Sequence, residues 1–193
     1  MDKKMIKYSV LWLHFYCVVC SDLPTICPNI ISKSGWNGLP ATHQDYVKIP
    51  VENIIIHHTV SEECYSLEEC ATSLRNIQSF HMDELEFHDM GYNFLIGSDG
   101  NVYEGAGWHK IAAHTRGYNS RSLGIAFVGN FSSKVPSEKM LNALRKFLEC
   151  GVKLGEIDQE YKLFGGRQVS ATSSPGAKLF KEIKTWPHFT NSP

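Results

Sequence analysis

The sequence of 193 residues lacks a surplus of charge of either sign. Lys and Arg together number 19 and Asp and Glu 20, so the formal net charge is −1 and the pI is about 6.7. A protein that binds nucleic acid needs a basic face to neutralise phosphates. The charge balance therefore argues against nucleic acid as a partner.

Long apolar runs are missing after the first twenty residues. The run from Tyr8 to Val19 is too short to span a bilayer, and a lysine-rich segment precedes it. These features predict a signal peptide over residues 1–20, and hence a secreted, extracellular protein without a membrane anchor. The alternative is a signal anchor, which the lack of a second apolar span disfavours.

Repeats, low-complexity tracts and interior linkers are also absent, which predicts a single domain. The length suffices for a sizeable core, and 42% hydrophobic and 20% charged residues are ordinary for a globular protein. Residues 21–50 contain Trp36 and several turn residues, so we expect them to form an irregular N-terminal segment. Residues 51–193 are then the main body of the domain.

The strand signals predict a sheet buried on both faces. Val51–Thr59 is an unbroken β-branched run, and Leu123–Val128 is a second buried strand. Gly91–Gly97 and Val102–Glu104 flank an Asp-Gly turn, the clearest hairpin signal in the chain.

Helix signals alternate with these strands. Ser66 and Glu69 form a capping box at one helix start. Pro136–Leu154 is amphipathic, and Pro175–Trp186 is the last expected helix, with Pro175 in its first turn. Strands alternating with helices predict an α/β domain, a mixed β-sheet flanked by about three helices.

Six cysteines are present, of which Cys17 and Cys20 would leave with the signal peptide. The remaining four allow three disulfide pairings; they are Cys27, Cys64, Cys70 and Cys150. Close Cys or His pairs around them are lacking, so structural zinc is a poor interpretation of these cysteines.

Two motifs carry the functional signal. The strand Val51–Thr59 ends in His57-His58-Thr59, and a strand-to-helix loop follows much later at Gly165–Gly176. Loops of this kind often carry sites. Together the motifs resemble the peptidoglycan recognition proteins, whose domains are similar to phage lysozyme-type zinc amidases. The resemblance covers residues 27–190, including Phe80–Asp83, Ala113–Thr115 and Thr185–His188. It is closest to the insect short secreted receptors that activate the Toll pathway.

The zinc ligands of the family's amidases are only partly present. The first matching position is His57, but the second is Gly166 and the third is Ser174. Catalytic zinc needs three protein ligands, and a neutral hydroxyl is a poor donor. We therefore expect a non-catalytic receptor without a cofactor. The alternatives are a residual amidase or a peptidase with Ser174 as nucleophile and His57 as its base.

The resemblance implies a groove over the sheet that binds glycan-peptide fragments (muropeptides). Imidazole, phenol, hydroxyl and amide groups suit such a ligand, because each offers a directional hydrogen bond. Trp108 is either a groove wall or a packed surface aromatic. The expected ligand-binding residues are His57, His58, Thr59, His81, Glu86, Phe87, Tyr92, Trp108, His114, Asn119, Thr172 and Ser174.

Three positions bear on which stem peptide is bound. Peptidoglycans have either lysine or diaminopimelate as the third residue of the stem peptide, and diaminopimelate carries an extra carboxylate. Family members that prefer diaminopimelate resemble one another in a Gly-Trp pair before the groove tyrosine and in a nearby arginine. This chain has Glu86-Phe87 and Ala106 there. An arginine grips a carboxylate bidentately. Its loss predicts a preference for lysine-type peptidoglycan.

Further expectations follow from the resemblance. It implies a Cys64–Cys70 disulfide, which leaves Cys27 and Cys150 as the second pair. It also implies a glucan-binding-type partner and a serine protease cascade upstream of Toll. Independently of the resemblance, Asn130-Phe131-Ser132 is a glycosylation sequon.

Overall fold

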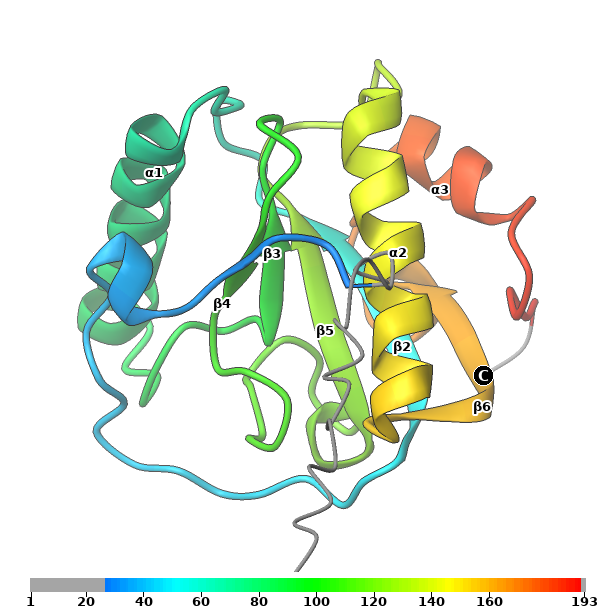
Figure 1. Ribbon diagram of the computed structural model, residues 1–193, viewed down its shortest axis with the longest axis horizontal. Coiled ribbons are helices and arrows are strands. Elements are labelled where there is room, and N and C mark those ends of the chain that lie inside the picture. The colour runs from blue at the N-terminus through cyan, green and yellow to red at the C-terminus, as the bar shows by residue number, and fades with distance from the viewer. Residues whose placement is uncertain (1–26, 192–193) are drawn as a thin grey trace, which may run out of the picture.

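The computed structural model describes residues 27–191, so the predicted signal peptide lies outside the described residues. Its centre is a six-stranded sheet in the order β1-β4-β3-β5-β2-β6 (Figure 1). Only the β3–β4 pair is antiparallel within this sheet. The predicted mixed α/β fold is confirmed. The strands are β1 (Ile30–Ile31), β2 (Val51–His58), β3 (Phe94–Ile96), β4 (Val102–Glu104), β5 (Ser122–Phe127) and β6 (Ile157–Gly165).

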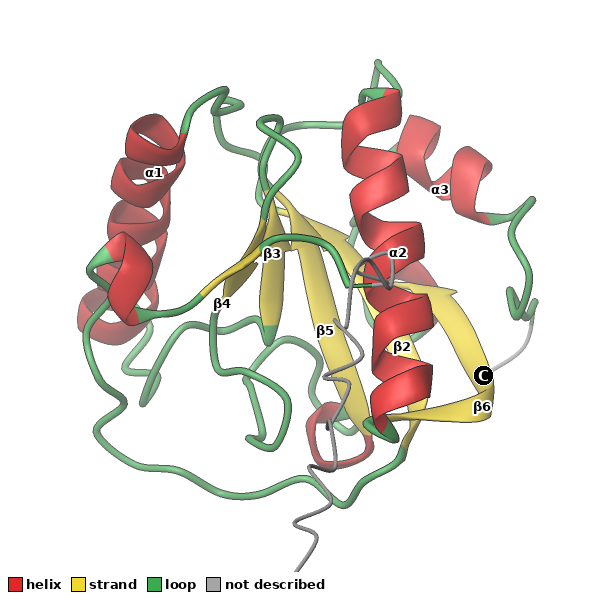
Figure 2. Ribbon diagram, viewed as in Figure 1, coloured by secondary structure: helices red, strands yellow, loops and turns green. Residues whose placement is uncertain are grey.

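Three α-helices cover the two faces of the sheet (Figure 2). On one side lies α1 (Leu67–Ser79), and on the other lie α2 (Glu138–Leu154) and α3 (Ala177–Ile183). The core is divided accordingly. The larger cluster joins α2 and α3 to the sheet, and the smaller one joins α1 to β3, β4 and Trp36.

The central strand β2 fixes the position of the site. It pairs in parallel with β5 and β6, and it is buried along nearly its whole length. Ile54 and Ile56 join the cluster under α2. Since successive side chains of a strand point to opposite faces, His57 lies on the other face of the sheet.

The predicted start of α1 and the predicted end of α2 are confirmed. The Ser66 hydroxyl accepts a hydrogen bond from the Glu69 N–H at 3.2 Å, as the capping box predicts. The Glu69 carboxylate, however, accepts from the Tyr65 N–H and not from the Ser66 N–H. Helix α2 ends at Gly155, whose φ of 76° suits glycine.

The region after α2 differs from expectation. The sequence has a short apolar run only at Tyr161–Phe164, yet β6 extends over Ile157–Gly165, because β2 also pairs with Ile157 across an irregularity in the register. Pro175 does not open the last helix. Gly176 is the N-cap, with φ 89°, and a Cβ there would meet the Phe131 carbonyl carbon at 2.5 Å.

Three further boundaries are corrected. Helix α3 ends at Ile183, so Trp186 lies in turns beyond it. Strand β3 is shorter than Gly91–Gly97. The N-terminal segment is not wholly irregular, because it contains β1 and a 3₁₀ turn, Ser34–Trp36, that buries Trp36 completely.

Both expected disulfides, Cys27–Cys150 and Cys64–Cys70, are present. Within the described residues, every helix is too short or too polar to cross a membrane.

Candidate functional site: a row of rings over the sheet

Four aromatic rings form a row across the face of the sheet that carries α1. His81 and Tyr92 have ring centroids 5.5 Å apart, Tyr92 and His57 5.5 Å, and His57 and His114 5.6 Å. They come from the end of α1, the loop before β3, strand β2 and the loop before β5. All four were predicted from the sequence, and the structure brings them together.

His57 occupies the centre of a hydrogen-bonded chain. Its Nε2 lies 3.1 Å from Thr115 Oγ1, which lies 3.1 Å from His114 Nδ1. On its other side, His57 Nδ1 lies 3.3 Å from Ser174 Oγ. Ser174 already accepts from the His58 backbone N–H at 3.1 Å, so its own proton is available for His57. All of these hydrogen bonds can form when the imidazoles of His57 and His114 are both neutral.

Burial keeps these imidazoles neutral. It lowers the pKa of His57 to about 4, with a smaller contribution from His58. It lowers the pKa of His114 to about 3, with a smaller contribution from His57. Desolvation disfavours the charged form of an imidazole, and two adjacent rings oppose each other's protonation. The row therefore presents neutral hydrogen-bonding rings at physiological pH.

The position equivalent to the amidases' second zinc ligand lies directly against His57. A Cβ on Gly166 would be 2.8 Å from His57 Cε1 and 3.5 Å from Ser174 Cβ. Positions 57, 166 and 174 thus meet at one point, as the resemblance implies. The side chains there do not fit zinc, because Gly166 offers no donor and Ser174 a neutral hydroxyl. Within residues 27–191 there is no group of three or more His, Cys, Asp or Glu side chains that could hold a metal ion.

His81 is held at the end of α1 by a single π-turn, Phe80–Glu84, a feature that recurs at functional sites. The Gly91 N–H donates to His81 Nδ1 at 3.0 Å, so Nε2 carries the ring proton. A groove of about 940 Å³ runs between α1 and the sheet, and His81, Tyr92 and Thr59 line it. Such a volume accommodates a sugar with a short peptide.

A second, smaller hollow of about 170 Å³ is lined by Phe87, Ala106 and Asn119. Phe87 also packs near His81, with ring centroids 5.7 Å apart. Asn119 accepts from the Thr115 N–H through Oδ1 at 2.7 Å. Glu86 is exposed and has a φ of 56°. The positions expected to select the stem peptide therefore adjoin the groove.

Two predicted site residues have contacts away from the row of rings. The His58 ring accepts from the Phe131 N–H through Nδ1 at 3.1 Å, and His58 also lines a pocket with His57 and Tyr92. Trp108 stacks on Phe147 with ring centroids 4.5 Å apart and packs near Phe94 at 4.7 Å. Trp108 is therefore a packed aromatic and not a groove wall, because it joins the core cluster that contains Phe147 of α2, on the face opposite α1.

Thr172 lies beside Ser174 in the loop after β6. Its hydroxyl accepts from the Ser174 N–H at 3.2 Å, and both residues line a pocket of about 300 Å³ with His57 and Tyr92. Sequence reasoning missed Thr115 and Ser122, which complete the hydrogen bonds of His57 and His114. Only the position of Thr115 directly after His114 pointed to a role.

Comparisons with known proteins agree with this geometry. Residues 47–177 match the family described as N-acetylmuramoyl-L-alanine amidase. Peptidoglycan-recognition protein 2 of Holotrichia diomphalia is 53% identical over 167 residues, which cover 86% of this chain and 89% of that protein.

The chain belongs to the peptidoglycan recognition protein family.

Solved structures of this family have the same fold. The structure of Drosophila peptidoglycan recognition protein SA has a TM-score of 0.85 and is 48% identical, covering 86% of this chain and 96% of that one. Peptidoglycan recognition protein LE, solved in complex with tracheal cytotoxin, a monomeric diaminopimelic acid-type peptidoglycan, has a TM-score of 0.83 and is 41% identical, covering 84% and 96%.

Proposed function

We propose that this peptidoglycan recognition protein is a secreted, non-catalytic receptor that binds muropeptides in the groove between α1 and the sheet. The observation that carries the proposal is the meeting of His57, Gly166 and Ser174 at one point with a single strong metal donor among them. The groove and its row of rings remain, while the donor set for a catalytic zinc is incomplete.

The decisive experiment separates binding from cleavage. Purified protein is titrated with muropeptides by calorimetry, and the same material is incubated with polymeric peptidoglycan and analysed by mass spectrometry. We expect saturable binding and no released stem peptides. Stem peptides released after addition of micromolar zinc would contradict the proposal.

A peptidase is the second candidate, because Ser174 Oγ lies 3.3 Å from His57 Nδ1. A serine nucleophile needs an adjacent base of suitable pKa. Here burial lowers the pKa of His57 to about 4, which makes it a weak base at neutral pH. We therefore rank this candidate below the receptor. Shortened stem peptides from the native protein but not from Ser174→Ala would establish it.

Within the groove we propose a preference for lysine-type over diaminopimelate-type peptidoglycan. Ala106 supplies no cation for the extra carboxylate of diaminopimelate. Removing that carboxylate from water without a cationic partner costs roughly several kcal/mol of binding free energy. Glu86 is exposed, so its repulsion contributes only about 0.2–1 kcal/mol. Tighter binding of the diaminopimelate muropeptide in matched calorimetry would refute this preference.

Signalling needs partners, because a single soluble domain transmits nothing alone. We propose that the ligand-bound protein recruits a glucan-binding-type partner and a serine protease cascade that leads to Toll signalling. Pull-downs from body fluid with and without peptidoglycan test this. Identical protein recovery in the two conditions would refute a ligand-dependent partner.

A further inference from the structure

The loop of residues 84–90, called here the recognition loop, borders the ligand groove. Leu85 lines the groove, and the ring of Phe87 lies 5.7 Å from that of His81. The Phe87 N–H also donates to the His81 carbonyl at 2.9 Å. Glu86 has a φ of 56°, which costs free energy and persists only where surrounding structure enforces it. The source of that enforcement lies behind the loop.

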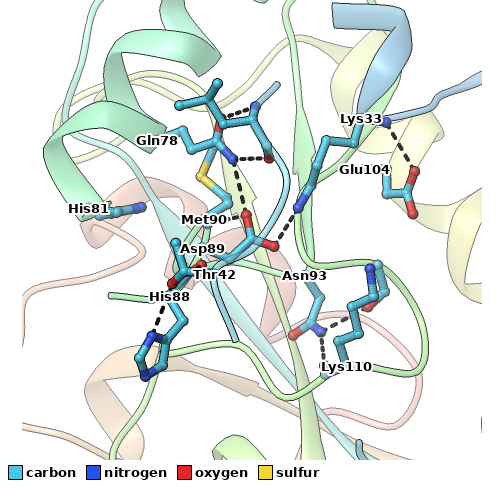
Figure 3. Close-up of polar contacts among 12 residues, drawn as sticks. Lys33, Thr42, Gln78, His81, His88, Asp89, Met90, Asn93, Glu104 and Lys110 are labelled. Atoms are coloured by element: carbon cyan, nitrogen blue, oxygen red, sulfur yellow. Dashed lines mark hydrogen bonds and ion pairs between the residues drawn. The ribbon is translucent and has the colours of Figure 1, made fainter. Parts of the chain in front are cut away.

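Asp89 anchors the recognition loop through both of its carboxylate oxygens (Figure 3). One carboxylate oxygen pairs with the Lys33 ammonium. The other accepts from Gln78 Nε2 at 3.0 Å and from the Met90 N–H at 2.7 Å. The Lys33 and Asp89 side chains are only 15% and 10% exposed, so solvent screens this pair far less than a surface pair.

Residues 33–42 of the N-terminal segment complete the network. Gln78 exchanges two hydrogen bonds with the backbone of Leu39, at 2.8 and 2.9 Å. Further along, the Thr42 N–H donates to the His88 carbonyl at 2.9 Å. In Figure 3, Lys33, Gln78 and Thr42 surround Asp89 and His88. These residues therefore hold the recognition loop at two positions, by a hydrogen bond to His88 and an ion pair with Asp89.

We propose that Asp89 and Lys33 are positioning residues that set stem-peptide selectivity by fixing the recognition loop. Neither residue lines the groove of about 940 Å³, although Asp89 lines the smaller hollow with Phe87 and Ala106. The segment between His81 and Asp89 carries Leu85, Glu86 and Phe87 between two fixed ends. Loss of the buried ion pair leaves an uncompensated charge at one end, and the loop shifts to solvate it. This inference rests on the proposed muropeptide binding.

Three variants of the mature chain test the proposal. Lys33→Met keeps the apolar stem and removes the ammonium. Asp89→Asn keeps the shape but places an amide against Lys33. Lys33→Arg keeps the charge. The control is Lys153→Met, which breaks the exposed Lys153–Glu149 pair on α2.

Each protein is titrated with three ligands: muramyl dipeptide, which lacks the third stem residue, and the lysine-type and diaminopimelate-type muramyl tripeptides. We expect Lys33→Met and Asp89→Asn to change the ratio of the two tripeptide Kd values by about threefold or more. Their Kd for the dipeptide should stay within about twofold of the native value, because the variants leave the pocket around His57 and Tyr92 untouched. Lys33→Arg and Lys153→Met should keep the native ratio.

The contrary outcomes are distinct. An unchanged tripeptide ratio in folded Lys33→Met and Asp89→Asn overturns the proposal. So does equal weakening of all three ligands, or the unfolding of both variants at 25 °C, since either result means a purely structural role. A native protein that binds none of the ligands refutes the proposed function itself.

Discussion

At the residue scale, the proposed function depends on two side chains that separate this site from a zinc centre. Gly166 and Ser174 stand where a histidine and a cysteine would complete the donor set around His57. There is no free space for a side chain at position 166, because the His57 ring lies against the position of its Cβ. Restoring the donors therefore requires that ring to move.

We predict that Gly166→His combined with Ser174→Cys creates a metal site. The new Cβ at 166 would lie 2.8 Å from His57 Cε1, so the imidazole must rotate, and the apo protein should be less stable than the native one. Cobalt titration is the measurement, since a thiolate ligand gives an intense charge-transfer band. The same double variant with His57→Ala is the control and should bind cobalt much more weakly. Equal binding by both proteins would show that His57 is not a ligand.

The buried imidazoles predict a pH dependence of stability. Burial holds the pKa of His57 at about 4, below the usual 6.5. Between these values the unfolded chain binds more protons, so this stability is complete above pH 6.5 and is lost as the pH falls toward 4. His57 alone contributes about 3 kcal/mol.

Thermal unfolding between pH 7.5 and 4 measures this dependence. His57→Gln should show a shallower decline in Tm than the native protein. The exposed His43 supplies the matched control, and His43→Gln should decline as steeply as the native chain. Parallel curves for native protein and His57→Gln would contradict the assignment.

At the element scale, the site is a product of strand alternation. Strand β2 places the His57 ring beside those of Tyr92 and His114, whereas the ring of the adjacent His58 accepts from the Phe131 N–H. The same sheet places the recognition loop, between α1 and β3, against the hollow that Ala106 lines after β4. Under the proposed function, ligand selectivity depends on these two loops.

We predict that Glu86→Gly, Phe87→Trp and Ala106→Arg together shift preference toward diaminopimelate-type ligands. The new guanidinium would enter the hollow beside Asn119 and bind the extra carboxylate bidentately. Calorimetry with matched tripeptides measures the ratio of Kd values. Ala106→Lys in the same background is the control, because a point charge lacks the bidentate geometry and should shift the ratio less. An unchanged ratio in the arginine variant would refute the role of position 106.

At the scale of the whole molecule, the two disulfides constrain the chain unequally. Cys27–Cys150 joins residues 123 positions apart and ties the start of the described chain to α2, whereas Cys64–Cys70 spans only 6 positions. In the chain-entropy model the stabilisation grows with the length of the closed loop. The long-range bridge therefore fixes the N-terminal segment that holds the recognition loop.

Replacing both Cys27 and Cys150 by alanine should lower the free energy of unfolding by about 5 kcal/mol, and replacing Cys64 and Cys70 by about 2 kcal/mol. Denaturant titration of the two double variants compares these values directly. The reverse order would show that native packing around each bridge outweighs the entropy of the unfolded chain.

Local sequence determined the elements and the chemistry of this protein. The β-branched run of β2, the hairpin turn and the capping residues act over a few positions, so their patterns are legible in the chain. The resemblance to the recognition family rested on short motifs of the same kind. It placed His57, Gly166 and Ser174 in one site.

Tertiary structure alone decided what each side chain faces. The sequence could not separate His58 from His57, move Trp108 to the core, or extend β6 beyond Tyr161–Phe164, because each outcome depends on a partner distant in the chain. The network of Lys33, Gln78 and Asp89 was hidden for the same reason. Its members lie up to 56 positions apart, and only the packing of the N-terminal segment against α1 brings their charges and amides within hydrogen-bonding distance.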